Sequence, residues 1–436
     1  MIPRTEMLQH YRTLATGISP ALPIQQKAAM HLQELNLPSK KDEDWHYTPL
    51  APLLEYRFAA NNDAFVEPHF KDIKKFLLGE QDGPRIVLVN GCFHPGLSCI
   101  SDTIDGLSVG SIQAEAVRKN KDVTNNLGAL SGEGSHLFSA LNTAVFNDGA
   151  WIRIAHDAVI EKPIELLHLT IAASGTPIFQ PRNLIMLEEG ASAMVIESSV
   201  SAGSNPCFNN MISEIFLGRN TGLEHLRLQN VNRVSRHLAG LYIREEENSH
   251  YHCTNTDLGA NWSRTEFNVD FAGENAECTL NGLYLAGDDQ STSIHLNISH
   301  AAPGCISHEF FKGILKGKGK AVFDGNVIVE KDAQKTDAHL KNANLLLSRE
   351  AEIDTKPVLQ INADDVQCSH GTTVGQIDPE LLFYLQARGI PEPQARKMIS
   401  LGFAKEILQR YPLPAIREMI EGILEVRLAD IEAVEG

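Results

Sequence analysis

The stretch that decides the fold is a run of alternating polar and apolar residues, Glu266-Phe267-Asn268-Val269-Asp270-Phe271. A second run of the same kind follows further along the chain, Ile294-His295-Leu296-Asn297-Ile298-Ser299. In a β-strand every second side chain points to the same face, so each run predicts a strand with one buried face. The two runs indicate β-structure in this part of the chain.

Similar short runs extend from about residue 85 to residue 370, and glycines with Asn or Asp beside them separate the runs, as at Gly273-Glu274-Asn275. No helical pattern intervenes over more than 200 residues, which argues against alternating strand–helix units. A sandwich of this length would be unusual as one domain, and no propeller repeat of about 40–50 residues is found. We therefore predict a β-helix, in which short strands stack around an apolar interior.

Both ends of the chain change to helical spacing. Near the N-terminus, Met7, Tyr11 and Leu14 recur at intervals of three or four residues. Near the C-terminus, the run Asp378-Pro379-Glu380 combines a capping residue, a first-turn proline and a first-turn acid. We predict three domains: a mainly helical N-terminal domain at 1–84, a β-helix core at 85–370 and a C-terminal helical domain at 371–436.

The last apolar stripe of the chain comprises Ile416, Met419, Ile420, Ile423 and Leu424. A stripe of this width predicts an amphipathic helix that buries one face. Two interpretations of the C-terminal helices are open, since they can cap an open end of the β-helix or dock a partner protein. The pattern alone favours capping.

The charge balance restricts the class of partner. The 436 residues include 38 Lys and Arg against 55 Asp and Glu, a net charge of −17, which repels phosphate backbones and anionic lipid. No run approaches the roughly 18 uncharged apolar residues of a membrane-spanning helix, and the first residues lack the pattern of a secretory signal. Seven dispersed cysteines indicate reduced thiols. We expect a cytoplasmic protein that binds neither nucleic acid nor membranes.

One cysteine lies in a segment that suits metal binding, residues 363–371. In an extended strand Cys368 and His370 point to the same face, and Asp364 joins them if the strand reaches that far. A thiolate and an imidazole together suit iron, zinc or an iron–sulfur centre. A lone cysteine is more often a small core residue, so the pattern alone favours a structural role.

Two enzymatic interpretations are weaker. The Gly- and Lys-rich segment 313–320 has the wrong spacing for a phosphate-binding loop, so we do not expect nucleotide hydrolysis. The order of Asn255, Asp257, Asp288-Asp289 and His370 faintly resembles the polygalacturonases, which use clustered carboxylates. Their Gly-His-Gly is Ser-His-Gly here, however, and their Arg-Ile-Lys element is missing. A β-helix hydrolase or lyase therefore remains only the alternative.

Several separated segments together resemble the SufB/SufD family of iron–sulfur cluster assembly proteins, on the side of SufD. The resemblance covers nearly the whole chain and includes the string Asp-Asp-Val-Gln-Cys-Ser-His-Gly at 364–371. The other segments that carry it are Glu43-Asp44-Trp45-His46-Tyr47-Thr48, His308-Glu309-Phe310-Phe311-Lys312-Gly313-Ile314, Gln334-Lys335-Thr336-Asp337-Ala338-His339-Leu340, Glu352-Ile353-Asp354-Thr355-Lys356-Pro357 and residues 382–390.

The resemblance implies a right-handed parallel β-helix between helical N- and C-terminal domains. It implies a non-catalytic scaffold subunit that works with the paralogue SufB and with the ATPase SufC, which would contact the C-terminal helices. It also implies that His370 faces SufB, with Cys368 as its neighbour, and that the two residues supply a partial ligand set to a transient iron–sulfur cluster. No cluster is then held tightly by this chain alone, and pairing of the isolated chain with itself is left open.

Overall fold

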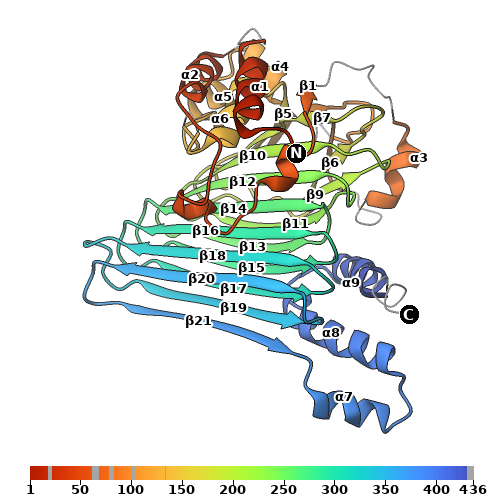
Figure 1. Cartoon of the computed structure of the whole chain (residues 1–436). Helices are drawn as coiled ribbons and strands as arrows, with labels where there is room; N and C mark the ends of the chain where they lie inside the picture. Colours follow the sequence, from red (N-terminus) through yellow and green to blue (C-terminus); the bar gives the residue numbers. More distant parts are fainter. Residues whose placement is uncertain (18–21, 61–67, 78–82, 101–103, 133, 430–436) are drawn as a thin grey trace.

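Two long, mainly parallel β-sheets wind together into a solenoid, which confirms the predicted β-helix (Figure 1). This computed structural model describes residues 1–17, 22–60, 68–77, 83–100, 104–132 and 134–429. The chain runs from a strand of one sheet to a strand of the other, and each strand pairs with the strand one turn earlier and the strand one turn later. The sheets run from β4 and from β2 and β3 at one end to β20 and β21 at the other (Figure 1).

The strands fall into two sheets, here named A and B. Sheet A contains β4 (Leu107–Ser111), β5 (Gly149–Ile154), β8 (Arg182–Leu187), β10 (Phe208–Leu217), β12 (Arg236–Glu245), β14 (Trp262–Phe271), β16 (Ser291–His300), β18 (Lys320–Val329) and β20 (Glu352–Ile361). In the same sheet β7 (Pro177–Phe179) pairs with β10, and β1 (Ala59–Ala60) pairs with β7. Sheet B contains β2 (Arg85–Val89), β3 (Cys92–Phe93), β6 (Ile164–Thr170), β9 (Ser192–Ser201), β11 (Gly222–Asn230), β13 (His250–Asp257), β15 (Glu277–Ala286), β17 (Ile306–Leu315), β19 (Asp337–Leu346) and β21 (Gln367–Gln376).

From β5 onward each turn of the solenoid takes 26 to 33 residues, since Arg236 pairs with Trp262 and Gly149 pairs with Arg182. The turns that lead from sheet A to sheet B contain a residue with φ between +54° and +76° in six successive coils: Gly190, Asn220, Asn248, Asn275, Gly304 and Lys335. Glycine and asparagine adopt this left-handed backbone most readily. The turn signals in the sequence thus mark one corner of the solenoid.

The interior of the solenoid is apolar for most of its length. Alternate side chains of both sheets point inward, among them Phe267, Val269, Phe271, Ile294, Leu296 and Ile298, and all of these are buried. Both runs therefore form strands whose apolar side chains make up a buried face, as predicted. At about 25 cal/mol for each Å² of apolar surface removed from water, this burial is the main stabilising contribution.

The N-terminal helices cover the outer face of sheet A. Helices α1 (Arg4–Thr16), α2 (Pro23–Leu32) and α6 (Leu137–Val145) pack with the outward side chains Phe208, Leu238 and Trp262. Trp45 is buried here, and the guanidinium of Arg264 lies 4.2 Å from its ring centroid. The other elements on this side are η1 (Glu43–Trp45), η2 (Ala51–Leu54), α4 (Ile112–Val117) and α5 (Lys121–Asn126). In contrast, α3 (Phe70–Ile73) and η3 (Lys74–Phe76) pack against the outer face of sheet B, at β2, β6 and β9.

The C-terminal helices lie against the outer face of sheet B. Apolar residues of α8 (Glu392–Leu408) and α9 (Pro414–Ala429) form one buried cluster with outward residues of β11, β15 and β17. The Tyr411 hydroxyl bonds to the Thr256 hydroxyl at 2.7 Å and to the Arg227 carbonyl at 3.1 Å. Lys312 donates to the Phe403 carbonyl at 3.0 Å. The interpretation that these helices cap an open end is therefore wrong, because they cover a side.

The last turn of the solenoid is formed by β20 and β21, and no strand of the described residues pairs beyond it (Figure 1). Strand β21 continues to Gln376, past the boundary expected at 370, and α7 (Pro379–Gln386) follows it. The inner face of β21 is uncovered, so its sequence lacks the apolar alternation that identified the other strands. Helices α4 to α6 interrupt the start of the predicted core. No helix within the described ranges is long and apolar enough to cross a membrane.

Candidate functional site

Cys368 and His370 lie side by side on the inward face of β21, as the sequence predicted. The register pairs Cys368 with Ala338 and His370 with Leu340, and both of these β19 residues are buried. Cys368 packs against the edge of the interior apolar cluster and is half-buried, whereas His370 is exposed because no strand lies above it. Asp364 precedes the strand, so the face that the two residues share does not extend to it.

The Cys368 thiol is not a preformed thiolate. Burial raises its pKa, and the Asp337 carboxylate adds to that effect, while a hydrogen bond with the Ala338 backbone opposes it. A thiol with a raised pKa keeps its proton near neutral pH and loses it when a metal binds. The strand thus presents one neutral thiol and one exposed imidazole at the open end of the solenoid.

These two residues are an incomplete ligand set for a cluster. An iron–sulfur cluster is usually held by four protein ligands, and Cys368 and His370 supply two donors. The other six cysteines are Cys92, Cys99, Cys207, Cys253, Cys278 and Cys305, and the last four are buried. Burial raises the pKa of the Cys207 and Cys305 thiols to about 11 and that of Cys253 to about 12. The thiols of these buried cysteines remain protonated at neutral pH.

A polar network that the sequence did not predict lies inside the early turns. The Glu197 carboxylate, on β9, accepts hydrogen bonds from Arg227 at 2.9 Å and from His225 at 3.1 Å, and His168 lies 3.2 Å away. All four side chains are buried. Burial raises the pKa of Glu197, but Arg227 and the two histidines outweigh it and hold the pKa well below the usual range. The carboxylate is therefore charged and paired, as a buried charge must be.

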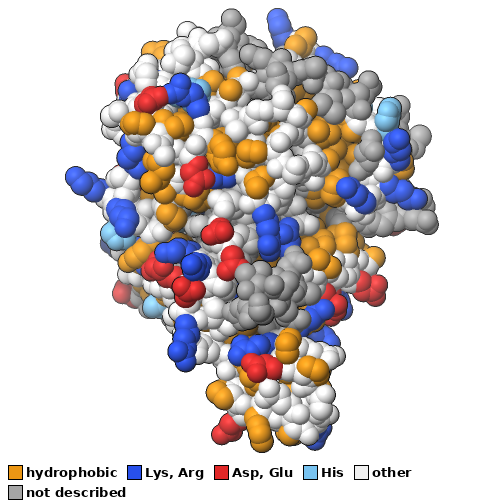
Figure 2. All heavy atoms as spheres, turned by 45° about the vertical axis from the view of Figure 1, so that its right-hand side comes forward, with side chains coloured by type: hydrophobic (Ala, Val, Ile, Leu, Met, Phe, Trp, Pro, Cys, Tyr) orange, Lys and Arg blue, Asp and Glu red, His pale blue; other side chains and the backbone are white. Residues whose placement is uncertain are grey.

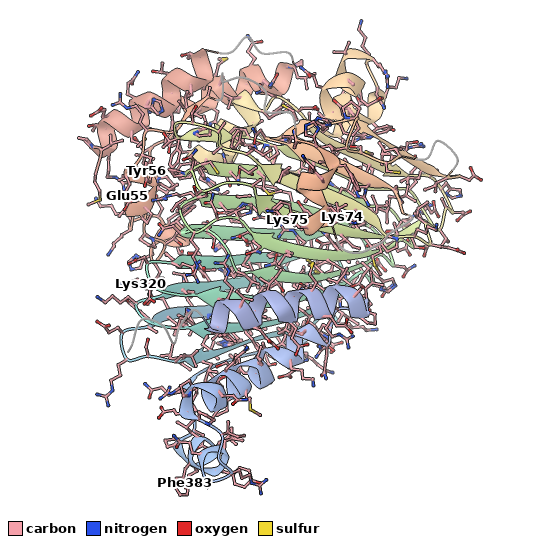
Figure 3. All side chains as sticks on the ribbon, turned by 90° about the vertical axis from the view of Figure 1, so that its right-hand side faces the viewer. Glu55, Tyr56, Lys74, Lys75, Lys320 and Phe383 are labelled. Atoms are coloured by element: carbon pink, nitrogen blue, oxygen red, sulfur yellow. The ribbon has the colours of Figure 1, made fainter. Side chains whose placement is uncertain are left out.

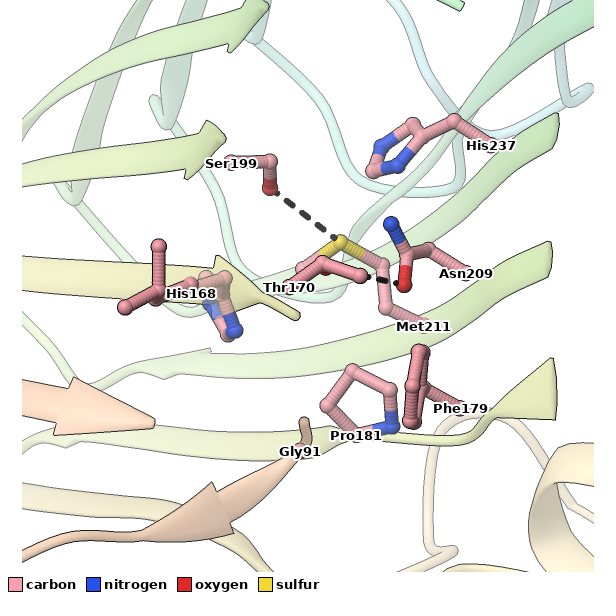
Figure 4. Close-up of a pocket in the computed structure, with 10 residues that line it drawn as sticks. Gly91, His168, Thr170, Phe179, Pro181, Ser199, Asn209, Met211 and His237 are labelled. Atoms are coloured by element: carbon pink, nitrogen blue, oxygen red, sulfur yellow. Dashed lines mark hydrogen bonds between the residues drawn. The ribbon is translucent and has the colours of Figure 1, made fainter. Parts of the chain in front are cut away.

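Beside this network lies a small cavity, shown in Figure 4. His168, Asn209 and His237 are among the residues that line it, and Thr170 donates to Asn209 at 3.1 Å. Its volume of about 10 Å³ is close to the minimum for one water molecule. Burial, with Arg227 nearby, lowers the pKa of His237 to about 3. A neutral imidazole beside a site for one water fits a structural role rather than substrate binding.

The residues of the hydrolase alternative do not come together. Asp257 is buried inside the solenoid, where its carboxylate accepts from Asn255 and Thr265, each at 3.0 Å. Asp288 lies in a surface turn and accepts from the Lys318 backbone at 3.1 Å. His370 is four strands away from Asp257 along sheet B. A pair of carboxylates flanking one bond, which glycoside cleavage requires, is not formed by these residues.

Helix α7 projects from the end of the molecule (Figure 1). It carries exposed hydrophobic side chains. Asp378 caps it, as predicted, by accepting from the Glu380 backbone at 2.9 Å. Phe383 is 70% exposed and Tyr384 is 50% exposed. Figure 2 shows hydrophobic side chains on this lobe, and Figure 3 places Phe383 at its far end.

Two family models from known proteins match consecutive parts of this chain. Residues 9–166 match the SufBD protein N-terminal region, and residues 169–403 match the SufBD core domain of SUF system FeS cluster assembly. The chain is 33% identical to an iron–sulfur cluster assembly SufBD family protein of Synechocystis, over 92% of this chain and 90% of the relative. It is also 33% identical to the iron–sulfur cluster assembly protein SufD of Escherichia coli, over 93% of this chain and 92% of the relative.

Both matches extend through the solenoid and into the C-terminal helices, so they cover the strand that carries Cys368 and His370. A SufD of Bacillus subtilis is 23% identical over 71% of this chain. The chain belongs to the SufBD family of iron–sulfur cluster assembly proteins.

Proposed function

We propose that this chain is the SufD-type subunit of a SufBCD-type scaffold complex in the cytoplasm, which assembles iron–sulfur clusters and transfers them to other proteins. In this role it is a non-catalytic subunit, and the cluster is its cargo. Its 33% sequence identity to Escherichia coli SufD, over 93% of this chain, supports the proposal. The observation that carries it furthest is the position of Cys368 and His370 on the last, uncovered strand of the solenoid.

The exposed edge of β21 suits a SufB-type paralogue as partner. Its residues, from Gln367 to Gln376, include no Lys, Arg, Asp, Glu or Pro. Charges and prolines are the usual protection of an edge strand against pairing. Strand β20, in contrast, carries Glu352, Lys356 and Pro357. Backbone pairing of β21 with an edge strand of the partner would bring ligands from the second chain beside His370.

Shared ligands would make the cluster transient. His370 and Cys368 would supply part of the coordination, and the partner would supply the rest. Separation of the two chains by a small movement would then leave the cluster with only part of its ligands. An ATPase attached to the C-terminal helices can produce such a movement during nucleotide turnover.

The test of the cluster site is anaerobic cluster assembly on the reconstituted three-protein complex. We expect His370→Ala to lower the yield of cluster at least tenfold while the complex stays intact, and Cys368→Ser to lower it as well. Thr372→Ala is the matched control, because Thr372 is exposed two residues further along the same face. An unchanged yield with His370→Ala in an intact complex would remove His370 from the site.

For the ATPase we propose the exposed face of α7 as the docking surface. Pro379, Glu380, Phe383, Tyr384 and Ala387 line a shallow depression there. Large exposed apolar side chains that cluster on a projecting helix are typical of protein interfaces. Aromatic anchors contribute most of the binding energy in such interfaces.

A point substitution tests this docking surface better than a deletion. Removing residues 378–436 would also expose the apolar outer face of sheet B that α8 and α9 cover. We expect Phe383→Glu to abolish co-purification with a SufC-type ATPase without changing the circular dichroism of the chain. Val426→Glu is the control, since Val426 is 62% exposed on α9. Retained ATPase binding with Phe383→Glu would refute this docking surface.

A further inference from the structure

Three potential metal ligands meet on the outer face of sheet B, near the start of the last strands. Asp337 and His339 are two residues apart on β19, so their side chains share a face. The register pairs His308 of β17 with His339, which brings a third ligand beside them. Stacking of the parallel strands thus brings together three residues that are separated in the sequence by about one turn of the solenoid.

The distances within this triad suit a metal ion. Nε2 of His339 lies 2.8 Å from Oδ1 of Asp337, and Nε2 of His308 lies 3.8 Å from the same oxygen. One ligand atom from each residue lies within 4.8 Å of the other two. Ligands about 2.1 Å from a metal are roughly 3 to 4.2 Å apart. Only small rotations of the exposed side chains would be needed to close the site.

A further contact prepares His339 for binding. Nδ1 of His339 and Oγ of Ser369, on β21, are 2.6 Å apart. When Nδ1–H donates to this hydroxyl, the lone pair of Nε2 is left facing Asp337 and His308. Histidine ligands of metals usually make such a hydrogen bond through the other ring nitrogen, which fixes the tautomer and the orientation of the ring.

We propose that His308, Asp337 and His339 form a binding site for a divalent first-row transition metal ion. Two imidazoles and one carboxylate are the ligand set typical of open Fe(II) sites and of Zn(II) sites with a free position. Their half-exposed side chains leave room for water or an incoming ligand. Ser369 points away from Cys368 and His370, so this site is separate from the cluster site and does not rest on the proposed function.

The test is a titration of the metal-stripped chain with Co²⁺ alone, followed by calorimetry and absorption spectroscopy. We expect one Co²⁺ site with only nitrogen and oxygen ligands, and at least tenfold weaker binding in His339→Ala and in Asp337→Asn. Ser369→Ala should weaken binding by roughly tenfold, because only the orientation of His339 is lost. These residues are partly exposed, so circular dichroism should be unchanged.

The matched control is His252→Ala, since His252 lies on the same face of sheet B, two strands before His308, and pairs with Glu224 at 2.9 Å. This variant should bind Co²⁺ as the wild type does. Equal affinity in the wild type and in a His308→Ala, His339→Ala double variant would overturn the proposal. So would a spectrum in which thiolate-to-cobalt bands account for all the bound metal.

Discussion

At the residue scale, Glu309 is a carboxyl group that the proposed function does not use and that the fold keeps uncharged. It points into the solenoid from β17, between Leu280 and Leu340 of the neighbouring strands, and it is buried. Burial raises its pKa from 4.5 to about 8. Such a group affects the pH dependence of stability from about pH 4.5 upward, where the unfolded chain loses the proton that the folded state keeps.

This shift gives a prediction for the pH dependence of stability. The folded state binds the proton more tightly than the unfolded state, so this residue lowers the free energy of unfolding as pH rises from about 4.5 to about 8. The loss approaches about 1.4 kcal/mol for each pH unit within that window. Glu309→Gln removes the titrating group and should therefore be more stable than the wild type at pH 8, by on the order of 3 kcal/mol, and similar to it at pH 5.

Urea unfolding of both proteins at pH 5, 6.5 and 8 measures this difference. A variant that is less stable than the wild type by the same amount at every pH would show that Glu309 is charged in the folded state. Glu309→Ala is unsuitable, because the cavity it leaves would destabilise the core at every pH.

At the scale of the element, β21 combines regular pairing on one side with a free edge on the other. The Gln367 amide donates to the Thr336 carbonyl at 2.8 Å. Because the direction of the amide alternates along a strand, odd-numbered residues of β21 direct their N–H groups toward β19, and even-numbered residues direct theirs toward the free edge. Adjacent residues of this strand therefore differ in what their amides contact.

Two neighbouring proline substitutions should separate partner pairing from folding. In Val374→Pro the amide that is lost faces the free edge, so we expect the fold to be retained and binding to a SufB-type paralogue to weaken at least tenfold. In Thr373→Pro the lost amide pairs with β19, so we expect the last strand to detach. Binding assays and circular dichroism of the two variants measure both effects. Undiminished binding by a folded Val374→Pro protein would contradict pairing through this edge.

How far the sequence predicts these elements depends on whether their pattern is local. Alternation in the run 266–271 identified β14, because one face of that strand is buried by its neighbours. Capping by Asp378 identified the start of α7 in the same way. The number of residues in each turn of the solenoid was not predicted. The left-handed position at its corner holds glycine or asparagine in most turns and lysine at position 335. No single repeated motif therefore marks it.

The same distinction applies to the candidate sites, because the sequence predicts contacts within one strand but not contacts between turns. Cys368 and His370 are two residues apart on one strand, so local geometry sufficed to bring them together. The contact of His308 with His339 depends on the length of one whole turn, and so does that of Glu197 with Arg227. A shift of one residue in that register would turn the side chains to the opposite face. The sequence offers only the alternation within each strand, such as Asp337 with His339, as a signal.

At the scale of the whole molecule, the solenoid has two unlike ends and a stability that should vary along its axis. Neighbouring turns contact mainly one another, as in other repeat proteins. The N-terminal helices and the outer helices α8 and α9 support the early and middle turns, whereas the residues of β20 and β21 are largely exposed or half-exposed. The last turn should therefore open locally at the lowest cost in free energy.

Hydrogen exchange measured by mass spectrometry tests this gradient and the proposed partner together. In the isolated chain at low concentration, amides in 352–376 should exchange faster than those of β12 to β16, where both sheets are buried. A SufB-type paralogue should slow exchange in β21 and leave the middle turns unchanged, because pairing adds hydrogen bonds only at the free edge. Protection of β21 that increases with the concentration of the chain alone would indicate self-association through the same edge. Protection by the paralogue that appears on sheet A and spares β21 would contradict the proposed interface, and equal exchange of 352–376 and β12 to β16 in the isolated chain would contradict the gradient.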